Sequence, residues 1–358
     1  MKPETILAAF DGEAFGYWIP RLVADGVDYN DIEAVRGRLG RWEDWPRAWA
    51  ERGAAHEAWA RECLAAGHRL TGGEALVRAS LCYHFGQIIA FHDPAEKADL
   101  QRRKVDAFRE AAPLLRPPAE RLEFPWRRVA LPGYLRLPEG SRPASCVVLI
   151  PGLDATKEDF HTFTELCLCR GLGTFAFDGP GQGEAQALSP LVEGYEGAIL
   201  AAVNALAARP EIDPKRIALL GRSLGGHYAI RAAAADARVA AAVVFGGFHD
   251  LAHWDAIPPL TREGFRQATG AATEEEARGR LASANLEGVL GFVRCPVLVV
   301  HGKRDAIIPW YQAERIATEL PAGATLWLDE DGVHCCHNHA VRYRPAMADW
   351  LATTLAGR

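Results

Sequence analysis

Hydrophobic and polar positions change their pattern along the chain near residues 112–126. Before this point the sequence is typical of helices: residues 45–66 are rich in Ala, Glu and Arg, and no stretch has a convincing strand pattern. Beyond it, short apolar runs with β-branched residues alternate with helical stretches. The sequence therefore predicts a helical domain over residues 1–116 and a mixed domain over residues 117–358, joined by the proline-containing linker 115–118.

Two local signals place helix starts in the first domain. Thr71-Gly-Gly-Glu74 has the spacing of a capping box, in which the first and last side chains satisfy backbone amides at a helix start. Asp93-Pro94 predicts a second start, with Asp93 as the cap and Pro94 in the first turn.

The second domain contains a series of short apolar runs that are typical of buried parallel strands. These runs are 146–150, 174–177, 217–220, 239–245, 297–300 and the weaker 326–328. Helical stretches separate most of them, and strand–helix–strand repetition implies a mostly parallel sheet covered on both faces. A hairpin over 126–137 is expected ahead of this sheet. Residues 246–294 interrupt the alternation and are too long for a simple crossover, so we interpret them as an inserted lid segment.

The strongest chemical motif is Gly221-Arg-Ser223-Leu224-Gly225, which directly follows one predicted strand and directly precedes a helix. This strand–turn–helix context is that of the nucleophile elbow of the α/β-hydrolase fold, where a sharp turn exposes the serine and requires glycine on both sides. The backbone amide of Leu224 would then be free to stabilise an oxyanion at the start of the helix. The alternative interpretation is a glycine-rich turn in which the serine has no catalytic role.

A serine hydroxyl needs a base, and in this fold the acid and then the histidine follow the serine along the chain. Asp305 lies in the loop after the strand 297–300, and His334 follows Gly332 in the loop after the last strand. We therefore predict a Ser223–Asp305–His334 triad. The rival acids are Asp329 and Asp331, which follow a different strand, and the rival bases are His337 and His339, which are expected to enter the last helix.

The loop after the first core strand should supply a second oxyanion donor, and the amide of Leu153 is the candidate. Asp178-Gly-Pro-Gly-Gln-Gly183 follows the next strand. It lacks the glycine spacing of a dinucleotide site, and Pro180 has no backbone N–H to donate to a phosphate. We therefore interpret it as a tight turn beside the active site.

Composition and charge argue against some classes of function. The chain has 358 residues, 49% hydrophobic and 24% charged, and a formal net charge of −6 without a long basic stripe, which argues against a nucleic-acid partner. The N-terminal sequence lacks the pattern of a signal peptide or membrane anchor, so we expect no membrane association, a cytoplasmic location and free thiols at the eight cysteines.

The run from His334 to His339 contains metal-ligand residue types. Adjacent residues cannot all converge on one tetrahedral ion, so we predict no metal and no cofactor.

Five segments together resemble one α/β-hydrolase subgroup. They are PGLDATKED at 151–159, DGPGQGE at 178–184, GRSLGG at 221–226, HGKRDAIIP at 301–309 and DGVHCCHN at 331–338. The subgroup includes 2,6-dihydroxypseudooxynicotine hydrolase, fungal hydrolases that shorten polyketide pyrones and fermentation-respiration switch proteins. The resemblance extends into residues 1–116, which look like its N-terminal cap domain. It implies a homodimer whose active site lies in a cleft between cap and core.

The resemblance also implies hydrolysis of a carbon–carbon bond next to a ketone, in an aromatic or polyketide-like small molecule. The nicotine branch uses a glutamate some way after its serine, and the corresponding neighbourhood here, 249–255, has none. Asp255, Tyr83 and His84 are therefore the candidates for an auxiliary acid or substrate contact, although Tyr83 and His84 lie in an apolar helix and are also plausible core residues. Alternative functions are a carboxylesterase or thioesterase, an acyltransferase, and a catalytically silent binding protein of the same fold.

Overall fold

The computed structural model describes residues 13–140 and 143–357, with side-chain environments from residue 18 onward, and the chain forms two compact units. One unit is helical and contains residues 1–121 together with a short return segment, 158–162. The other contains residues 122–157 and 163–358. The first crossing between units therefore lies a few residues beyond the linker predicted at 115–118. Sequence reasoning did not foresee the return segment.

The helical unit is built from five described α-helices and two short 3-10 turns. These are α2 (Glu13–Ala24), α3 (Tyr29–Arg36), η1 (Trp42–Asp44), α4 (Trp45–Ala65), α5 (Arg69–Ile88), α6 (Pro94–Ala111) and η2 (Ala112–Leu114). The cap predicted at Asp93 is confirmed, because its side chain accepts hydrogen bonds from the amides of Ala95 and Glu96. The capping box predicted at Thr71 is wrong: α5 already begins at Arg69, so Thr71 lies inside the helix.

Aromatic side chains and glycines set the packing of α4 against α5. The indole of Trp45 donates to the carbonyl of Phe85 over 2.7 Å, which satisfies a polar group in the core. A Cβ at Gly53 of α4 would lie 2.3 Å from the ring of Tyr83, so glycine allows the two helices to approach closely at that point. Within the described chain no helix is both long and apolar enough to cross a membrane.

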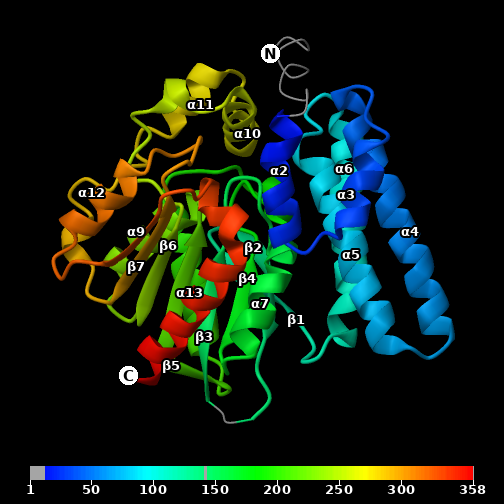
Figure 1. The fold of residues 1–358 in the computed structure, drawn as a ribbon. Helices are drawn as coiled ribbons and strands as arrows, with labels where there is room; N and C mark the ends of the chain where they lie inside the picture. Colours follow the sequence, from blue (N-terminus) through cyan, green and yellow to red (C-terminus); the bar gives the residue numbers. More distant parts are fainter. Residues whose placement is uncertain (1–12, 141–142, 358) are drawn as a thin grey trace. The chain divides into compact units, whose positions relative to one another are not determined.

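The second unit is organised around an eight-stranded sheet in the order β1-β2-β4-β3-β5-β6-β7-β8 (Figure 1). The strands are β1 (Glu120–Trp126), β2 (Val129–Arg136), β3 (Ala144–Ile150), β4 (Gly173–Phe177), β5 (Ile212–Arg222), β6 (Ala241–Phe245), β7 (Val297–Gly302) and β8 (Thr325–Asp329). β2 pairs antiparallel with β4, and every pair from β4 through β8 is parallel. All six predicted apolar runs are strands of this sheet, although β6 begins two residues later than its run.

Both faces of the central strands are buried. Cys146, Val148 and Ile150 of β3 belong to the core cluster that includes the helices α8 (Tyr195–Ala207) and α9 (Leu224–Ala235). The intervening Val147 and Leu149 are also fully buried and point to the opposite face, because side chains alternate along a strand. This double burial explains why the strands have continuous apolar sequences.

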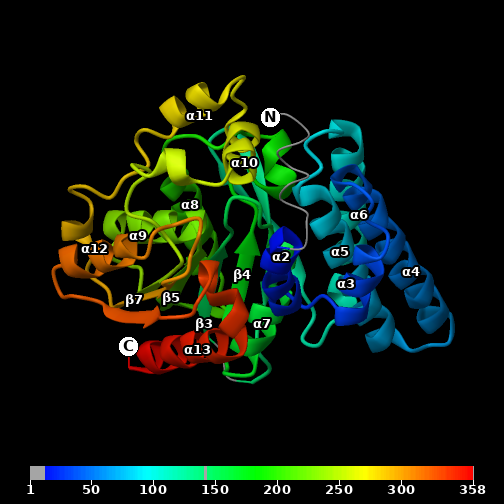
Figure 2. The same cartoon turned by 45° about the horizontal axis from the view of Figure 1, so that its top comes forward.

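Further helices and the insertion complete the second unit. They are η4 (Gly183–Ala187), α12 (Tyr311–Glu319), η7 (His334–His339) and α13 (Ala340–Ala356), with η5 (Trp254–Ala256), α10 (Pro259–Thr269), α11 (Glu274–Arg280) and η6 (Leu290–Phe292) between β6 and β7. The insertion thus has helices of its own, drawn in yellow in Figure 2. A Cβ at Gly264 of α10 would lie 3.2 Å from the Leu153 side chain, so α10 packs over the loop that follows β3. The return segment 158–162 of the helical unit forms most of η3 (Lys157–Phe160) and the start of α7 (His161–Leu168), and the rest of α7 belongs to the second unit.

Candidate active site

Ser223 occupies the sharp turn between β5 and α9. Its backbone has φ 55° and ψ −119°, a conformation that costs energy for a residue with a Cβ and is typical of functional turns. A Cβ at Gly221 would lie 2.0 Å from the Gly225 carbonyl oxygen, and a Cβ at Gly225 would lie 2.2 Å from the Ile150 carbonyl oxygen. Glycine is therefore required on both sides of the serine, as the motif indicated.

The loop after β3 approaches this turn closely. A Cβ at Gly152 would lie 3.3 Å from the Cβ of Ser223, so the backbone of the loop passes directly beside the serine. Gln182 holds the loop in place by donating from Nε2 to the carbonyls of Pro151 and Gly152, over 2.9 and 2.5 Å. The hydroxyl of Tyr195 donates to Oε1 of the same glutamine over 2.5 Å. The sequence Asp178–Gly183 thus contributes a buried loop-positioning residue, which sequence reasoning missed.

Leu224 directly follows Ser223 in the serine turn, and Leu153 lies in the loop after β3. Leu224 is the first residue of α9, so its amide has no carbonyl acceptor within the helix. Leu153 follows Gly152 directly in the loop beside Ser223. Their two amides are accordingly the candidates for binding a negatively charged oxygen formed next to the serine.

Asp305 and His334 meet in the loops that follow β7 and β8. Nδ1 of His334 lies 2.6 Å from Oδ2 of Asp305, and the aspartate side chain is fully buried. The other oxygen, Oδ1, accepts hydrogen bonds from the amides of Ile307 and Ile308 over 2.8 and 2.9 Å. These amides fix the carboxylate, and its hydrogen bond to Nδ1 leaves the second ring nitrogen of His334 available for chemistry.

Backbone contacts hold the loops of Ser223, Asp305 and His334 together. The amide of Ser223 donates to the Phe245 carbonyl over 2.8 Å, and the Cys335 thiol donates to the same oxygen over 3.5 Å. A Cβ at Gly302, at the end of β7, would lie 2.2 Å from the Gly332 carbonyl oxygen. The serine turn and the histidine loop therefore share one carbonyl, and the loops after β7 and β8 are in direct contact.

The pKa values of Asp305 and His334 shift in opposite directions. Burial alone would raise the pKa of Asp305, but the neighbouring imidazoles of His334 and His301 hold it well below its usual range. Burial alone would lower the pKa of His334, but the charge of Asp305 raises it well above 6.5. The pair therefore combines an ionised carboxylate with an imidazole that binds a proton readily, as a general base must.

The rival residues named from the sequence have other partners. His339 pairs through Nδ1 with Oδ2 of Asp329 over 2.5 Å, and Asp331 pairs with Arg304 over 2.5 Å at the surface. His337 lies 3.2 Å from a guanidinium nitrogen of Arg344. The histidines from 334 to 339 thus interact with different groups and do not converge on one ion.

Cys335 and Cys336 complete a strained turn directly after His334. Both have left-handed backbones, with φ 50° and 43°, which is unusual for residues other than glycine. A Cβ at Gly246 would lie 2.7 Å from the Cys335 sulfur, so the thiol fits against the turn after β6. Both cysteines are buried and free, and they stabilise the histidine loop by packing.

The three residues considered as auxiliary groups each have partners within their own unit. Asp255 has a side chain that is 85% exposed and pairs with Arg278 over 3.3 Å. In the helical unit, the hydroxyl of Tyr83 donates to Glu57 over 2.9 Å and accepts from Arg103 over 2.5 Å. His84 is fully buried, with Nε2 3.2 Å from Oδ2 of Asp159.

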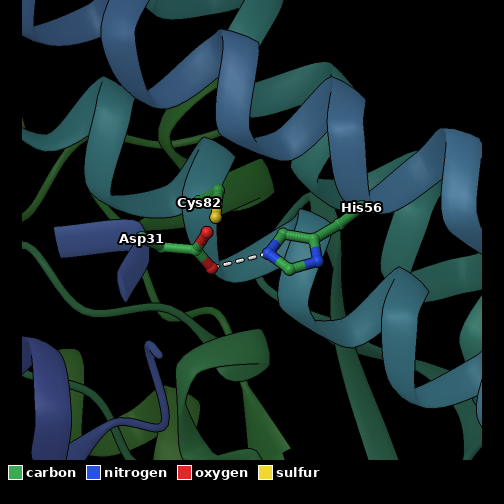
Figure 3. Close-up of side chains that lie close together, drawn as sticks. All are labelled: Asp31, His56 and Cys82. Atoms are coloured by element: carbon green, nitrogen blue, oxygen red, sulfur yellow. Dashed lines mark hydrogen bonds and ion pairs between the residues drawn. The ribbon is translucent and has the colours of Figure 1, made fainter. Parts of the chain in front are cut away.

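One group in the helical unit has the residue types of a metal site. Asp31, His56 and Cys82, from three different helices, bring an oxygen, a nitrogen and a sulfur within 4.8 Å of one another (Figure 3). Oδ2 of Asp31 lies 2.6 Å from Nε2 of His56, while Oδ1 accepts from Arg52. The guanidinium already neutralises this carboxylate and would repel a cation, so the group fits an ion pair that ties α3 to α4 better than it fits a metal centre.

The chain is similar to known hydrolases over nearly its whole length. Residues 24–355 match the family model described as esterase FrsA-like. The 2,6-dihydropseudooxynicotine hydrolase of Paenarthrobacter nicotinovorans is 39% identical, over 94% of this chain and 91% of the relative. The 20-hydroxy-prefusarin hydrolase of Gibberella moniliformis is 29% identical, over 68% of this chain and 62% of the relative.

Solved structures agree with these relatives. The crystal structure of the 2,6-dihydroxy-pseudo-oxynicotine hydrolase matches with a TM-score of 0.90 and 38% identity, over 95% of this chain and 97% of that chain. The structure of AbyA5, 21% identical with a TM-score of 0.75, shares the fold. The predicted α/β-hydrolase fold and hydrolase class are confirmed. The chain belongs to the FrsA-like esterase family, and it is an α/β-fold hydrolase.

Proposed function

We propose that the chain is a serine hydrolase in which Ser223 is the nucleophile, His334 the general base and Asp305 the acid that orients the histidine. The buried hydrogen bond between Asp305 and His334 carries this proposal, because it leaves one imidazole nitrogen free in a loop that shares the Phe245 carbonyl with the serine turn. The strained backbone of Ser223 supports it further, since such strain is typical of a nucleophile elbow.

The proposed substrate is an aromatic or polyketide-like small molecule with a ketone, and the proposed reaction hydrolyses the carbon–carbon bond beside the carbonyl. The supporting observation is the 39% identity, over nearly the whole chain, to a relative named for an oxynicotine substrate. A second relative is named for a prefusarin, and it is similar over about two thirds of this chain. From these relatives we take only the class of substrate, a large aromatic or polyketide-like molecule. We do not propose either named compound as the substrate of this chain.

The first chemical step is acylation of Ser223. His334 removes the hydroxyl proton, and the serine oxygen attacks the ketone carbon to give a tetrahedral oxyanion. The amides of Leu153 and Leu224 stabilise this charge; loss of one such donor typically costs about 10²–10³ in rate. The carbon–carbon bond then breaks, its electron pair stays with the departing carbon, and His334 returns the proton to that carbon.

The second step releases the acyl group. His334 removes a proton from water, the resulting hydroxide attacks the acyl-serine, and the acid product leaves as Ser223 recovers its proton. A carbon leaving group requires stabilisation, which an adjacent carbonyl or a hydroxylated aromatic ring provides as an enolate or phenolate. The substrate itself can therefore act as the electron sink, so we assign no proton transfer to Asp255, Tyr83 or His84.

Ester hydrolysis is the second candidate function, and the description of the matching family as esterases favours it. The same three residues would catalyse it, with an alkoxide in place of the carbon leaving group. Ester cleavage makes a smaller demand on the site, because an alkoxide is a better leaving group than an unstabilised carbanion.

Two substrate panels distinguish these functions. We expect purified enzyme to cleave β-diketones and acylated dihydroxybenzenes to an acid and a ketone or arene, and Ser223→Ala to abolish this cleavage. A fluorophosphonate probe should label the wild-type enzyme at Ser223 and leave Ser223→Ala unlabelled. Cleavage confined to aryl esters would replace carbon–carbon hydrolysis by esterase activity, and labelling that persists in Ser223→Ala would contradict the proposed nucleophile.

We also infer a homodimer in the cytoplasm. The dimer rests on the resemblance to the subgroup, and light scattering coupled to gel filtration would test it by giving twice the chain mass of 39.0 kDa. The cytoplasmic location is supported by eight free cysteines, which are typical of a reducing compartment. Cell fractionation with compartment markers would test it.

A further inference from the structure

A second histidine lies against the carboxylate of Asp305. His301, on β7, has a fully buried side chain, and its Nε2 lies 2.9 Å from the Ile308 carbonyl oxygen and 3.3 Å from Oδ2 of Asp305. Oδ2 is also the oxygen that binds His334. Two imidazoles therefore meet at one carboxylate oxygen, and the triad chemistry uses only one of them.

The neighbours of His301 determine which of its nitrogens carries a proton. Both groups near Nε2, the Ile308 carbonyl and the Asp305 carboxylate, are acceptors, so Nε2 must be the donor. Nδ1 is buried, and no hydrogen-bond partner for it is present among the described residues. The tautomer with the proton on Nε2 is thus the one that the site accommodates.

His301 closes a ring of hydrogen bonds around the aspartate loop. The amides of Ile307 and Ile308 donate to Oδ1 of Asp305, while the Ile308 carbonyl accepts from His301. His301 in turn contacts Oδ2. Because the turn at Ile307 and Ile308 holds Oδ1 and His301 of β7 contacts Oδ2, the carboxylate cannot rotate without breaking one of these contacts.

We propose that His301 is a positioning residue, whose Nε2–H holds the Asp305 carboxylate in the orientation that presents Oδ2 to Nδ1 of His334. This proposal rests on the proposed triad, because it concerns the orientation of the triad acid. His301 touches neither the serine nor a reacting atom, so its effect on catalysis passes entirely through Asp305.

The rate at which a fluorophosphonate probe labels Ser223, measured against pH, tests this proposal without knowledge of the substrate. In His301→Leu, we expect labelling to slow by roughly tenfold to a hundredfold, less than the ~10⁴ typical of losing the acid itself. We also expect the inflection of the pH profile to move to lower pH, because a carboxylate that can turn away stabilises the His334 imidazolium less. His301→Gln, whose amide nitrogen can replace Nε2 as a donor, should restore most of the rate and the inflection.

His249→Leu is the matched control, because His249 is another buried histidine of the same unit, bonded to Asp250 and Glu319 and not to Asp305. It should leave the inflection where it is in the wild-type enzyme. If His301→Leu only reduces the folded fraction and keeps the wild-type inflection, as His249→Leu does, the positioning role is overturned. A wild-type enzyme that is not labelled at Ser223 would overturn the triad and this role together.

A measurement on the wild-type protein applies even if His301→Leu does not fold. Two-bond ¹H–¹⁵N correlation spectra of ¹⁵N-histidine-labelled protein report the tautomer of each imidazole. We expect the resonances that disappear in His301→Gln to show a proton on Nε2 and none on Nδ1. A proton on Nδ1 of His301 would overturn the proposal, because Nε2 could then not donate to Asp305.

Discussion

Asp305, in the loop after β7, and Asp329, the last residue of β8, each bind a histidine, but the two pairs have different surroundings. Asp305 is fully buried and receives two amides in addition to His334. Asp329 is also buried and accepts one amide, that of Asp331, but its partner His339 has a side chain that is 39% exposed. The same two residue types thus form one pair that is enclosed on both sides and one that is open to solvent on the histidine side, and only the enclosed pair matches the surroundings expected of a catalytic acid and base.

The largest expected difference between the two pairs is catalytic. Asp305→Asn should reduce kcat by about 10⁴, because the amide favours the wrong imidazole tautomer and removes the charge that stabilises the imidazolium. Asp329→Asn, at the end of β8, is the matched change and should alter kcat by no more than a few-fold. Steady-state kinetics on a cleaved substrate would measure both, and equal losses in the two variants would contradict the assignment of Asp305.

The contact between the loops after β7 and β8 should be the next most sensitive feature. Gly302→Ala places a methyl group 2.2 Å from the Gly332 carbonyl oxygen, so we expect the free energy of unfolding to fall by about 1–3 kcal/mol and activity to fall with it. Gly279→Ala in α11 is the control, because no atom lies within 4 Å of its Cβ position, and it should be neutral or stabilising. Chemical denaturation measures both; an unchanged stability for Gly302→Ala would show that the loops separate easily.

The pH dependence of activity should also distinguish Asp305 from Asp329. Because Asp305 raises the pKa of His334 above 6.5, the imidazole is protonated and inactive at low pH. We therefore expect kcat/KM to increase with pH through an inflection above 6.5, and Asp329→Asn to leave this inflection in place. Asp305→Asn should move the inflection to lower pH. A wild-type profile with its inflection at or below 6.5 would contradict this account.

The smallest change is expected in the stability contribution of the Asp329–His339 pair, in which the histidine is accessible to solvent. His339→Gln should lower the free energy of unfolding by at most about 1 kcal/mol, because ion pairs accessible to solvent contribute little. The difference should shrink further in high salt, which screens exposed charges. Urea denaturation of both proteins at low and high salt would measure it, and a loss of several kcal/mol would show that the β8 loop depends on this pair.

Much of the fold and part of the candidate site could be predicted from local sequence. The apolar runs of β3 through β8 and the Gly221-to-Gly225 turn are properties of consecutive residues, so their signals survive without the tertiary structure. Of the two predicted helix caps, Asp93 caps α6, whereas Thr71 is not a cap because α5 begins two residues earlier, at Arg69. The chain order of serine, acid and histidine supplied the rest of the site prediction.

The residues that the sequence did not reveal act through contacts that only the folded chain forms. Gln182 gives no motif signal for its bonds to the carbonyls of Pro151 and Gly152, which lie about thirty positions earlier. His301 lies within a quoted motif, but only the folded turn shows that its Nε2 faces both Ile308 and Asp305. Likewise, the grouping of residues 158–162 with the helical unit depends on contacts that no local pattern encodes.

The sequence by itself determined the parallel sheet, the glycine-flanked serine turn and the order of the three candidate triad residues, because periodicity, backbone sterics and chain direction are local properties. The tertiary structure decided which histidine meets which aspartate, and how deeply each pair is buried. His334 and His339 are five positions apart and chemically identical in the sequence. Only the folded structure, which places His334 against Asp305 and leaves His339 more exposed at the other end of the same segment η7, gives them different partners and different electrostatic environments.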